Sequence, residues 1–415
     1  MNMPLSSWLD DIPAQLSALD GAHLRRKRRV VTAQSPAHLT VDGQPMLAFC
    51  SNDYLGLSHH PDLVATAAAA ARTHGVGSGG SPLVCGHSAA NAALEQDLAR
   101  FAQLPSALYF YAGYATNASI IPALVGEGDA LFSDALNHAC LIDGARLSKA
   151  AIHRYAHNDV SALEQALSDS PARRKLVVSD AVFSMDGDEA DIPRLLAACE
   201  RHDALLLLDD AHGLGTLGPE GRGSLSLHGL TGSGASRRVL YMATLGKAAG
   251  VAGAFVAGDP ALVEWLLQKT RSYIFATAAP PMLAATLTRS LALMAAADER
   301  RAHLQQRIQQ LRHGLQALTQ GTHWQLGTSR TAIQPLVVGS NEEALALMEA
   351  LRTRGLWVPA IRPPTVPEGT ARLRIALSAV HSASEVDRLL AALAELAPRP
   401  ALTPAAPPTA SRAGC

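Results

Sequence analysis

Lys247 is the residue whose surroundings most need a chemical explanation. It lies in 243-ATLGKAAGVAGAF-255, where the neighbours within four positions on either side are apolar, Gly or Thr. Burying an unpaired ammonium group is costly, and a solvated helix would surround a lysine with polar residues. Apolar surroundings favour loss of the proton, which turns the amine into a nucleophile toward a carbonyl group. The alternatives are a loop with its lysine in solvent, or a lysine that holds an aldehyde cofactor as a Schiff base.

Further polar side chains follow apolar runs of the kind that form buried strands. They are Ser184 after 175-KLVVSD-180, Asp209 and His212 at the end of 204-ALLLLDD-210, and Thr244 and Lys247 after 238-RVLYMA-243. In an open parallel sheet, ligands bind beyond the carboxyl ends of the strands. We therefore expect an acid, an imidazole, two hydroxyls and an amine to converge at one edge of a sheet.

A possible phosphate-binding turn follows the run 107-ALYFY-111. Gly113 and Tyr114 lie where this strand would pass into a helix, and free backbone N–H groups there can face an anion. His138 follows another run, 130-ALFSD-134, and offers a second imidazole. Taken singly, the glycine is explained by a tight turn and the histidine by an interface position with satisfied hydrogen bonds.

Together these groups fit pyridoxal phosphate (PLP). The lysine would bind the aldehyde, the acid would keep the pyridine nitrogen protonated, backbone amides would bind the phosphate, and a flat imidazole would stack on the ring. A metal at Asp209, Asp210 and His212 is a weaker hypothesis, because these residues offer too few ligands. The glycine-rich stretch 75-GVGSGGSPLVCG-86 follows an Ala-rich helix instead of a strand, which argues against dinucleotide binding.

The bulk composition indicates a soluble globular protein. Of 415 residues, 48% are hydrophobic and 17% charged, and the net charge of −1 gives no electrostatic case for nucleic acid. Five scattered cysteines without a CxxC pair predict thiols in a reducing compartment. No signal peptide or long apolar segment is recognisable, so we expect a cytoplasmic protein without membrane contact.

The order of the apolar runs predicts an α/β fold. Short continuous apolar runs that alternate with helices are typical of a mainly parallel sheet covered on both faces. The expected organisation is an N-terminal helix and arm (residues 1–60, with the helix over 5–29), a large α/β domain (61–290), a small α+β domain (291–397) and a disordered tail (398–415).

The ordered motifs resemble those of the α-oxoamine synthases, which are fold-type-I PLP-dependent transferases. The resemblance covers residues 5 to 396 almost without gaps. Its motifs are SNDYLGLSHHP (51–61), GSGGS (77–81), NHAC (137–140), RYAHNDV (154–160), VFSMDGD (182–188), DDAHGLGTLGPEGRGS (209–224), TLGK (244–247) and AIRPPTVPEGTARLRIALSAVH (360–381). It implies a PLP-dependent acyltransferase that joins an amino acid to an acyl thioester with loss of CO2.

The resemblance also implies a role for individual residues. Lys247 is similar to the lysine that binds PLP, Asp209 to the partner of the pyridine nitrogen, His212 to the donor to the phenolic oxygen, and His138 to the ring-stacking residue that also faces the substrate. Gly113 and Tyr114 match the phosphate-binding backbone, and Ser184 and Thr244 match hydroxyls near the cofactor. Asn52, Arg362, Thr365 and Arg25 match substrate contacts, with Arg26 as the alternative to Arg25.

Within the family, IRPPTVP and RYAHNDV favour the member that condenses L-alanine with a pimeloyl thioester in biotin biosynthesis. The acyl donor is pimeloyl-CoA or a pimeloyl carrier protein, and a sister enzyme that uses glycine is the alternative. A non-catalytic partner subunit would be expected to lack Lys247. Family members are homodimers, so we expect a dimer. Ala249 departs from the family pattern, in which this position is usually bulky, and brings the fine fit of the substrate into question.

Overall fold

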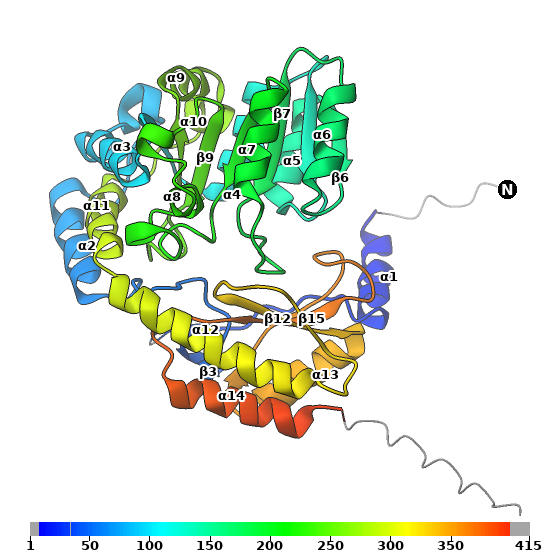
Figure 1. The fold of residues 1–415 in the computed structure, drawn as a ribbon. Helices are drawn as coiled ribbons and strands as arrows, with labels where there is room; N and C mark the ends of the chain where they lie inside the picture. Colours follow the sequence, from blue (N-terminus) through cyan, green and yellow to red (C-terminus); the bar gives the residue numbers. More distant parts are fainter. Residues whose placement is uncertain (1–7, 34, 399–415) are drawn as a thin grey trace, which may run out of the picture.

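A seven-stranded sheet forms the centre of the large lobe in the computed structural model, which describes residues 8–33 and 35–398 (Figure 1). In spatial order its strands are β4 (Ser106–Phe110), β10 (Ala254–Gly258), β9 (Val239–Thr244), β8 (Leu205–Asp209), β7 (Lys175–Asp180), β5 (Ala130–Asp134) and β6 (Ala151–Tyr155). Only β10 runs opposite to its neighbours, so the sheet is mainly parallel, as predicted.

Both faces of this sheet are buried, which explains the continuous apolar runs. Successive side chains of a strand point to opposite faces. In β8, Leu206 and Leu208 belong to one hydrophobic core, and Leu207 belongs to the core on the other side. A strand that is buried on both faces needs apolar residues at every position, so the sheet is the middle layer of an α/β sandwich.

Helices cover the two faces of the sheet. The face of Leu207 is covered by α4 (Gly113–Leu124), α5 (Ala139–Ser148), α9 (Pro260–Lys269) and α10 (Arg271–Ile274). The face of Leu206 is covered by α3 (Ala89–Ala102), α6 (Val160–Asp169), α7 (Ile192–Arg201) and α8 (Ser224–Leu227), and α2 (Pro61–His74) and α11 (Pro281–Ala295) complete the same core. Short helical turns span Pro82–Gly86, Pro219–Gly221 and Gly232–Gly234.

The small lobe contains two four-stranded sheets. One has the order β1 (Val31–Ala33), β2 (His38–Val41), β3 (Gln44–Ala48) and β13 (Leu356–Trp357), and the other has β11 (Gln325–Leu326), β12 (Ile333–Gly339), β15 (Ala371–Ala376) and β14 (Ala360–Ile361). Its helices are α12 (Asp298–Thr319), α13 (Asn341–Arg352) and α14 (Ala383–Leu396). Because β3 pairs with β13, the N-terminal arm joins the C-terminal part of the chain. The boundary at residue 290 stays a prediction.

Two expectations differ from the structure: the end of the N-terminal helix and the set of strands in the large sheet. The N-terminal helix, α1 (Trp8–Gly21), ends before the basic run 23-HLRRKRR-29 instead of including it, because Gly21 ends the helix and His23 adopts a left-handed conformation. The strands β6 and β10 were not predicted. β6 is an exposed edge strand without an apolar run, and β10 follows directly on a glycine-rich loop. The predicted tail 398–415 lies almost entirely outside the described residues.

Candidate active site

A cavity of about 200 Å³ lies at the carboxyl edge of the large sheet. Its walls come from the ends of β4, β5, β7, β8 and β9, which all reach the same edge of the sheet. The lining residues are Gly113, Tyr114, His138, Cys140, Asp180, Asp209, Ala211, His212, Met242, Thr244 and Lys247. Seven of the predicted site residues, from Gly113 to Lys247, are therefore brought together from distant parts of the chain.

Lys247 lies in the loop after β9, and its amine faces a histidine. Its Nζ is 2.9 Å from His212 Nε2. Burial lowers the pKa of Lys247, while the carboxylates of Asp209 and Asp180 oppose this shift. The side chain is therefore neither free in solvent nor neutralised by an ion pair, in agreement with an amine that is disposed to react.

Two carboxyl groups also line the cavity. Asp209 is buried and accepts hydrogen bonds from Asn117 Nδ2 at 2.6 Å and from the N–H of Ala211 at 2.9 Å. Asp180 accepts from the N–H of His138 at 2.6 Å. Burial and the nearby charge of Asp209 raise the pKa of Asp180 well above its ordinary value. Two donors thus hold the Asp209 carboxylate at the wall of the cavity, next to a second carboxyl group.

The turn between β4 and α4 is suited to an anion. Ala112, which precedes the helix, is extended and provides no side-chain cap, so the first N–H groups of α4 have no capping partner. A side chain on Gly113 would bring its Cβ within 3.3 Å of Met242 Cε. The glycine therefore keeps the backbone accessible from the cavity, where the helix dipole favours a phosphate.

His138 is oriented by the start of α5. Its Nδ1 accepts from the N–H of Cys140 at 3.2 Å, so the hydrogen of the neutral ring lies on Nε2. Burial lowers the pKa of His138, Asp209 opposes the shift and Lys247 adds to it. The ring of Tyr114 lies edge-on to this imidazole, with the two ring centroids 6.3 Å apart. The Tyr114 hydroxyl donates a hydrogen bond to Asp143.

This set of groups fits PLP. One cavity contains an amine of lowered pKa, a buried carboxylate, an imidazole and uncapped backbone N–H groups. Each matches one functional group of the cofactor, respectively the aldehyde, the pyridine nitrogen, the aromatic ring and the phosphate.

The other predicted site residues do not line this cavity. The carbonyl group of Ser184 and Oδ1 of Asn52 both accept hydrogen bonds from Arg374, at 2.6 and 3.3 Å. Arg25 and Arg362 line a separate cavity of about 480 Å³ beside α13, together with Arg26. Thr365 is exposed. The roles of these residues as substrate contacts stay predictions.

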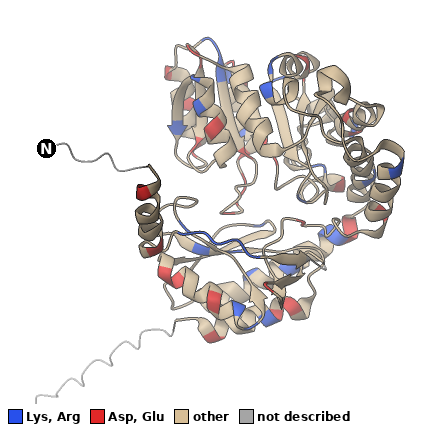
Figure 2. Cartoon of the chain, turned by 180° about the vertical axis from the view of Figure 1, so that it is seen from behind, with Lys and Arg blue, Asp and Glu red and all other residues tan. Residues whose placement is uncertain are grey.

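The basic run 23–29 extends along the small lobe (Figure 2). Within it, Arg25 pairs with Asp20 at 2.6 Å and Arg29 pairs with Asp42 at 2.9 Å. The run therefore contributes cations to the rim of the separate cavity, and part of their charge is neutralised by local carboxylates.

Four residues that contact the site were not predicted from the sequence: Tyr54, Asn117, Asp180 and Arg374. Asp180 was detectable, because it ends β7 at the same edge as Asp209 ends β8. Arg374 belongs to 372-RLRIAL-377, where two arginines alternate with apolar residues on one strand. Tyr54 and Asn117 gave no comparable signal, since their partners, His212 and Asp209, are 158 and 92 residues away.

Asp210 and Ala249 lie outside the cavity. The carboxylate of Asp210 accepts hydrogen bonds from the hydroxyls of Tyr241 and Ser224, at 2.8 and 2.6 Å. Unlike Asp209, it does not line the cavity. Ala249 is buried in the core, where its carbonyl accepts from Ser290 at 2.6 Å. No cluster of three or more His, Cys, Asp or Glu residues suitable for a metal occurs within residues 8–33 and 35–398.

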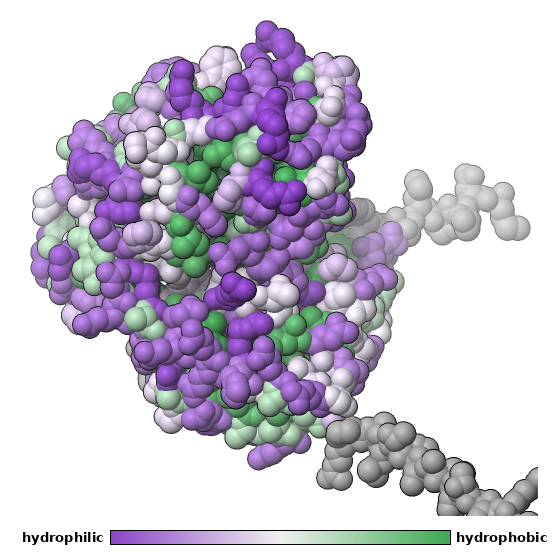
Figure 3. Space-filling view, viewed as in Figure 1, coloured by the Kyte–Doolittle hydropathy of each residue, from purple (hydrophilic) through white to green (hydrophobic). Residues whose placement is uncertain are grey.

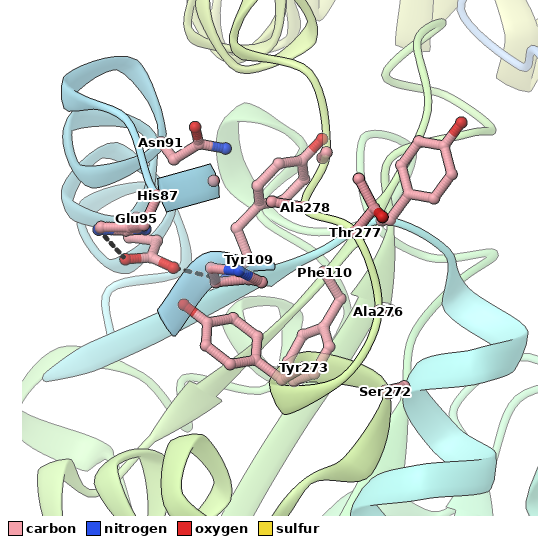
Figure 4. A pocket seen from close by; sticks show the side chains of 14 residues that line it. His87, Asn91, Glu95, Tyr109, Phe110, Ser272, Tyr273, Ala276, Thr277 and Ala278 are labelled. Atoms are coloured by element: carbon pink, nitrogen blue, oxygen red, sulfur yellow. Dashed lines mark hydrogen bonds and ion pairs between the residues drawn. The ribbon is translucent and has the colours of Figure 1, made fainter. Parts of the chain in front are cut away.

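A second pocket lies between α3, β4 and α10 (Figure 4). Glu95 accepts a hydrogen bond from the backbone N–H of Tyr109 at 3.0 Å, and its Oε2 lies 3.8 Å from Nε2 of His87. Burial raises the pKa of Glu95 to about 7. The cavity has a volume of about 20 Å³, which is enough for one water molecule and not for a cofactor. The chemistry is therefore assigned to the Lys247 cavity.

The chain is similar in sequence to known proteins of one family. The profile of the family described as aminotransferase class I and II matches residues 44–393. The 8-amino-7-oxononanoate synthase of Paracidovorax citrulli is 74% identical over 392 residues, which cover 94% of this chain and 95% of the relative.

No helix in the described part of the chain is long and apolar enough to cross a membrane.

Two solved structures have the same fold. A serine palmitoyltransferase variant from S. paucimobilis, with bound PLP and myriocin, has a TM-score of 0.87 at 30% identity and covers 95% of this chain and 98% of its own. The 8-amino-7-oxononanoate synthase of Francisella tularensis has a TM-score of 0.72 at 26% identity and covers 85% and 97%, respectively.

Proposed function

Because the chain belongs to the aminotransferase class I and II family, we propose that it catalyses the 8-amino-7-oxononanoate synthase reaction with PLP as cofactor. L-alanine and a pimeloyl thioester give 8-amino-7-oxononanoate, CO2 and the free thiol of the acyl carrier, a step of biotin biosynthesis. The observation that carries the proposal is the single cavity in which Lys247, Asp209 and His138 meet, in a chain 74% identical to a synthase of this name.

Four residues of the cavity are proposed to act in this reaction. PLP, when bound, supplies an electron sink that stabilises negative charge at Cα of the amino acid. Lys247 would hold the aldehyde group of PLP, and its free amine would take the Cα proton on Nζ. Asp209 would supply negative charge for the pyridine nitrogen. His138 would donate from Nε2 to an oxygen atom of the substrate, and His212 would donate to the phenolic oxygen of PLP.

Arg374 is suited to bind the carboxylate of the amino acid. Its side chain is buried, with 6% exposed, and no carboxylate in the described part of the chain pairs with it. Its guanidinium donates to the carbonyl of Ser184 and to Asn52 Oδ1, which are neutral acceptors. A buried cation without a counter-ion is costly, and an anionic substrate would supply the missing charge.

Replacing Arg374 by lysine should raise KM for L-alanine by about 10- to 100-fold, with a smaller change in kcat, because the ammonium cannot form the paired hydrogen bonds of a guanidinium. Steady-state kinetics with varied L-alanine measure this effect. Arg372 is the matched control, since it is equally buried on the same strand but pairs with Asp186. Arg372→Lys should lower the melting temperature instead of raising KM. An unchanged KM in Arg374→Lys would contradict the assignment.

Residues of the small lobe are proposed to bind the acyl chain. Arg25, or Arg26 beside it, and Arg362 and Thr365 are proposed to contact the pimeloyl donor. Support comes from the cations that line the cavity beside α13, which suit the terminal carboxylate of a pimeloyl group. A carrier protein is a possible donor besides CoA, since both present the same thioester.

A homodimer is proposed from the exposed hydrophobic residues of two adjoining segments. Ser78 Oγ donates to the carbonyl of Ala278, so the glycine-rich stretch lies against the segment after α10. Nearby, Val76, Val84 and Phe275 are 76%, 81% and 67% exposed. Figure 3 shows one face of the molecule, which is largely hydrophilic with small hydrophobic patches. Exposed apolar residues that gather on adjoining segments favour a protein interface, and a second copy is the proposed partner.

A cytoplasmic location is also proposed. Cys50, Cys85, Cys140 and Cys199 are all free thiols, which is typical of a reducing compartment. The net charge of −1 gives no basis for a nucleic-acid partner.

The visible absorption spectrum of the purified protein with PLP tests the function first. We expect a band of bound cofactor that responds more strongly to L-alanine than to glycine or L-serine, followed by CO2 release when pimeloyl thioester is added. A stronger response to glycine would indicate that the protein is a sister synthase that uses glycine. The absence of a band would contradict the role of Lys247.

A further inference from the structure

A line of hydrogen-bonding side chains connects the loop after β3 with the reactive lysine. Tyr54 Oη lies 3.2 Å from Asn52 Oδ1 and 2.6 Å from His212 Nδ1, and His212 Nε2 lies 2.9 Å from Lys247 Nζ. Tyr54 and His212 are 1% and 6% exposed. Solvent therefore cannot replace a hydrogen bond that one of these partners leaves unmade.

Few hydrogens are available along this line. Burial, together with the charges of Lys247 and Arg374, lowers the pKa of His212 well below its ordinary value, so its imidazole carries a single hydrogen. Asn52 Oδ1 can only accept. The Tyr54 hydroxyl has one hydrogen, which it can give to Asn52 or to His212, but not to both.

Two arrangements satisfy every group. In the first, the Lys247 ammonium donates to His212 Nε2, Nδ1–H donates to Tyr54, and Tyr54 donates to Asn52. In the second, Tyr54 donates to Nδ1, and Nε2–H donates to the neutral amine or to an oxygen atom of a bound ligand. The arrangements differ by the one proton that Lys247 loses, and Asn52 Oδ1 keeps Arg374 as a donor in both.

We propose that Tyr54 is a positioning residue that sets the tautomer of His212. Its hydroxyl accepts from Nδ1 while Lys247 is protonated and donates to Nδ1 once the amine is neutral or bound. His212 Nε2 therefore acts as an acceptor for Lys247 and as a donor for the ligand without leaving a buried polar atom unpaired. The inference rests on the proposed function for the role of Lys247, whereas the tautomer is a property of the chain.

Imidazole nitrogen NMR of the full-length chain, freed of PLP and labelled with 15N-histidine, tests this inference. Comparison with a His212→Asn variant identifies the His212 signals. In the wild type we expect hydrogen on Nδ1 at acidic pH and on Nε2 after Lys247 has lost its proton. Other ionisable groups that face this pair are His138, Cys140, Asp180, Asp209 and Arg374.

Tyr54→Phe is expected to move this switch to lower pH. Phenylalanine offers Nδ1–H no acceptor, and an unpaired buried donor is unfavourable, so the form with an ammonium on Lys247 and hydrogen on Nδ1 should persist only at lower pH than in the wild type. Tyr109→Phe is the matched control, because the Tyr109 hydroxyl is buried and has no hydrogen-bond partner among the described residues. The control should switch like the wild type. Circular dichroism establishes that both variants are folded.

Asn52→Leu gives a second test should Tyr54→Phe fail to fold. Without Asn52 as an acceptor, the Tyr54 hydroxyl is unpaired while Lys247 is protonated and paired with Nδ1 once the amine is neutral, so the hydrogen should move to Nε2 at lower pH than in the wild type. The inference is overturned if the wild-type tautomer does not change with pH, or if Tyr54→Phe or Asn52→Leu switches like the wild type. A missing PLP absorption band together with an intact switch would contradict the proposed function alone.

Discussion

Replacing Lys247 with alanine is expected to lower turnover by roughly 10⁴-fold or more while the chain remains folded. The amine is the group assigned both to bind PLP and to take the Cα proton, and its only hydrogen-bonding partner among the described side chains is His212. Burial disfavours the charged form of Lys247, so removing this amine costs the fold little. Turnover with L-alanine and pimeloyl thioester, and absorption during titration with PLP, measure the two losses.

Two further lysine variants distinguish the chemistry from the charge. Lys247→Arg keeps a positive charge but cannot be deprotonated, so it should be as inactive as Lys247→Ala. Lys269→Ala removes an exposed lysine that lies over the ring of Trp265, 5.2 Å from its centroid, and should turn over normally. Wild-type turnover in either Lys247 variant would rule out the proposed mechanism.

Replacing Asp209 with asparagine is expected to lower kcat by about 10²- to 10³-fold and to weaken PLP binding. Asn117 and the N–H of Ala211 hold the carboxylate charge at the wall of the cavity. Asparagine keeps the shape but removes the negative charge that favours a protonated pyridine nitrogen. In this variant the new amide would meet the Asn117 donor either with its own NH2 group, which is a second donor, or with its oxygen, which is a weaker acceptor than a carboxylate. The kcat and the dissociation constant of PLP are the quantities to measure.

Asp210→Asn is the matched control for this substitution. Asp210 is as buried as Asp209 and adjacent to it, but its partners are Ser224 and Tyr241 and it does not line the cavity. Asp210→Asn should lower the melting temperature and change kcat per folded molecule far less than Asp209→Asn does. If the two variants had equal effects on kcat, Asp209 would have only a structural role.

The central strands could be predicted because burial on both faces requires an unbroken apolar run. This condition holds for β7, β8 and β9, and their ends supplied Asp209, His212 and Thr244. It fails for β6, whose first four residues are exposed, so the edge strand left no such run. The end of α1 was misplaced because the basic run 23–29 was taken as part of the helix, whereas the helix ends at Gly21 and the backbone is left-handed at His23.

The sequence by itself determined the reactive groups. Lys247 in apolar surroundings, Asp209 at the end of an apolar run and Gly113 at a strand-to-helix turn each have a local signature, and parallel strands necessarily bring their carboxyl ends to one edge. Only the tertiary structure decided which partners these groups meet. The unpaired charge of Arg374 and the contact of Tyr54 with His212 depend on the packing of the small lobe against that edge. Such packing is set by the shapes of both lobes together, and no single stretch of the chain encodes it.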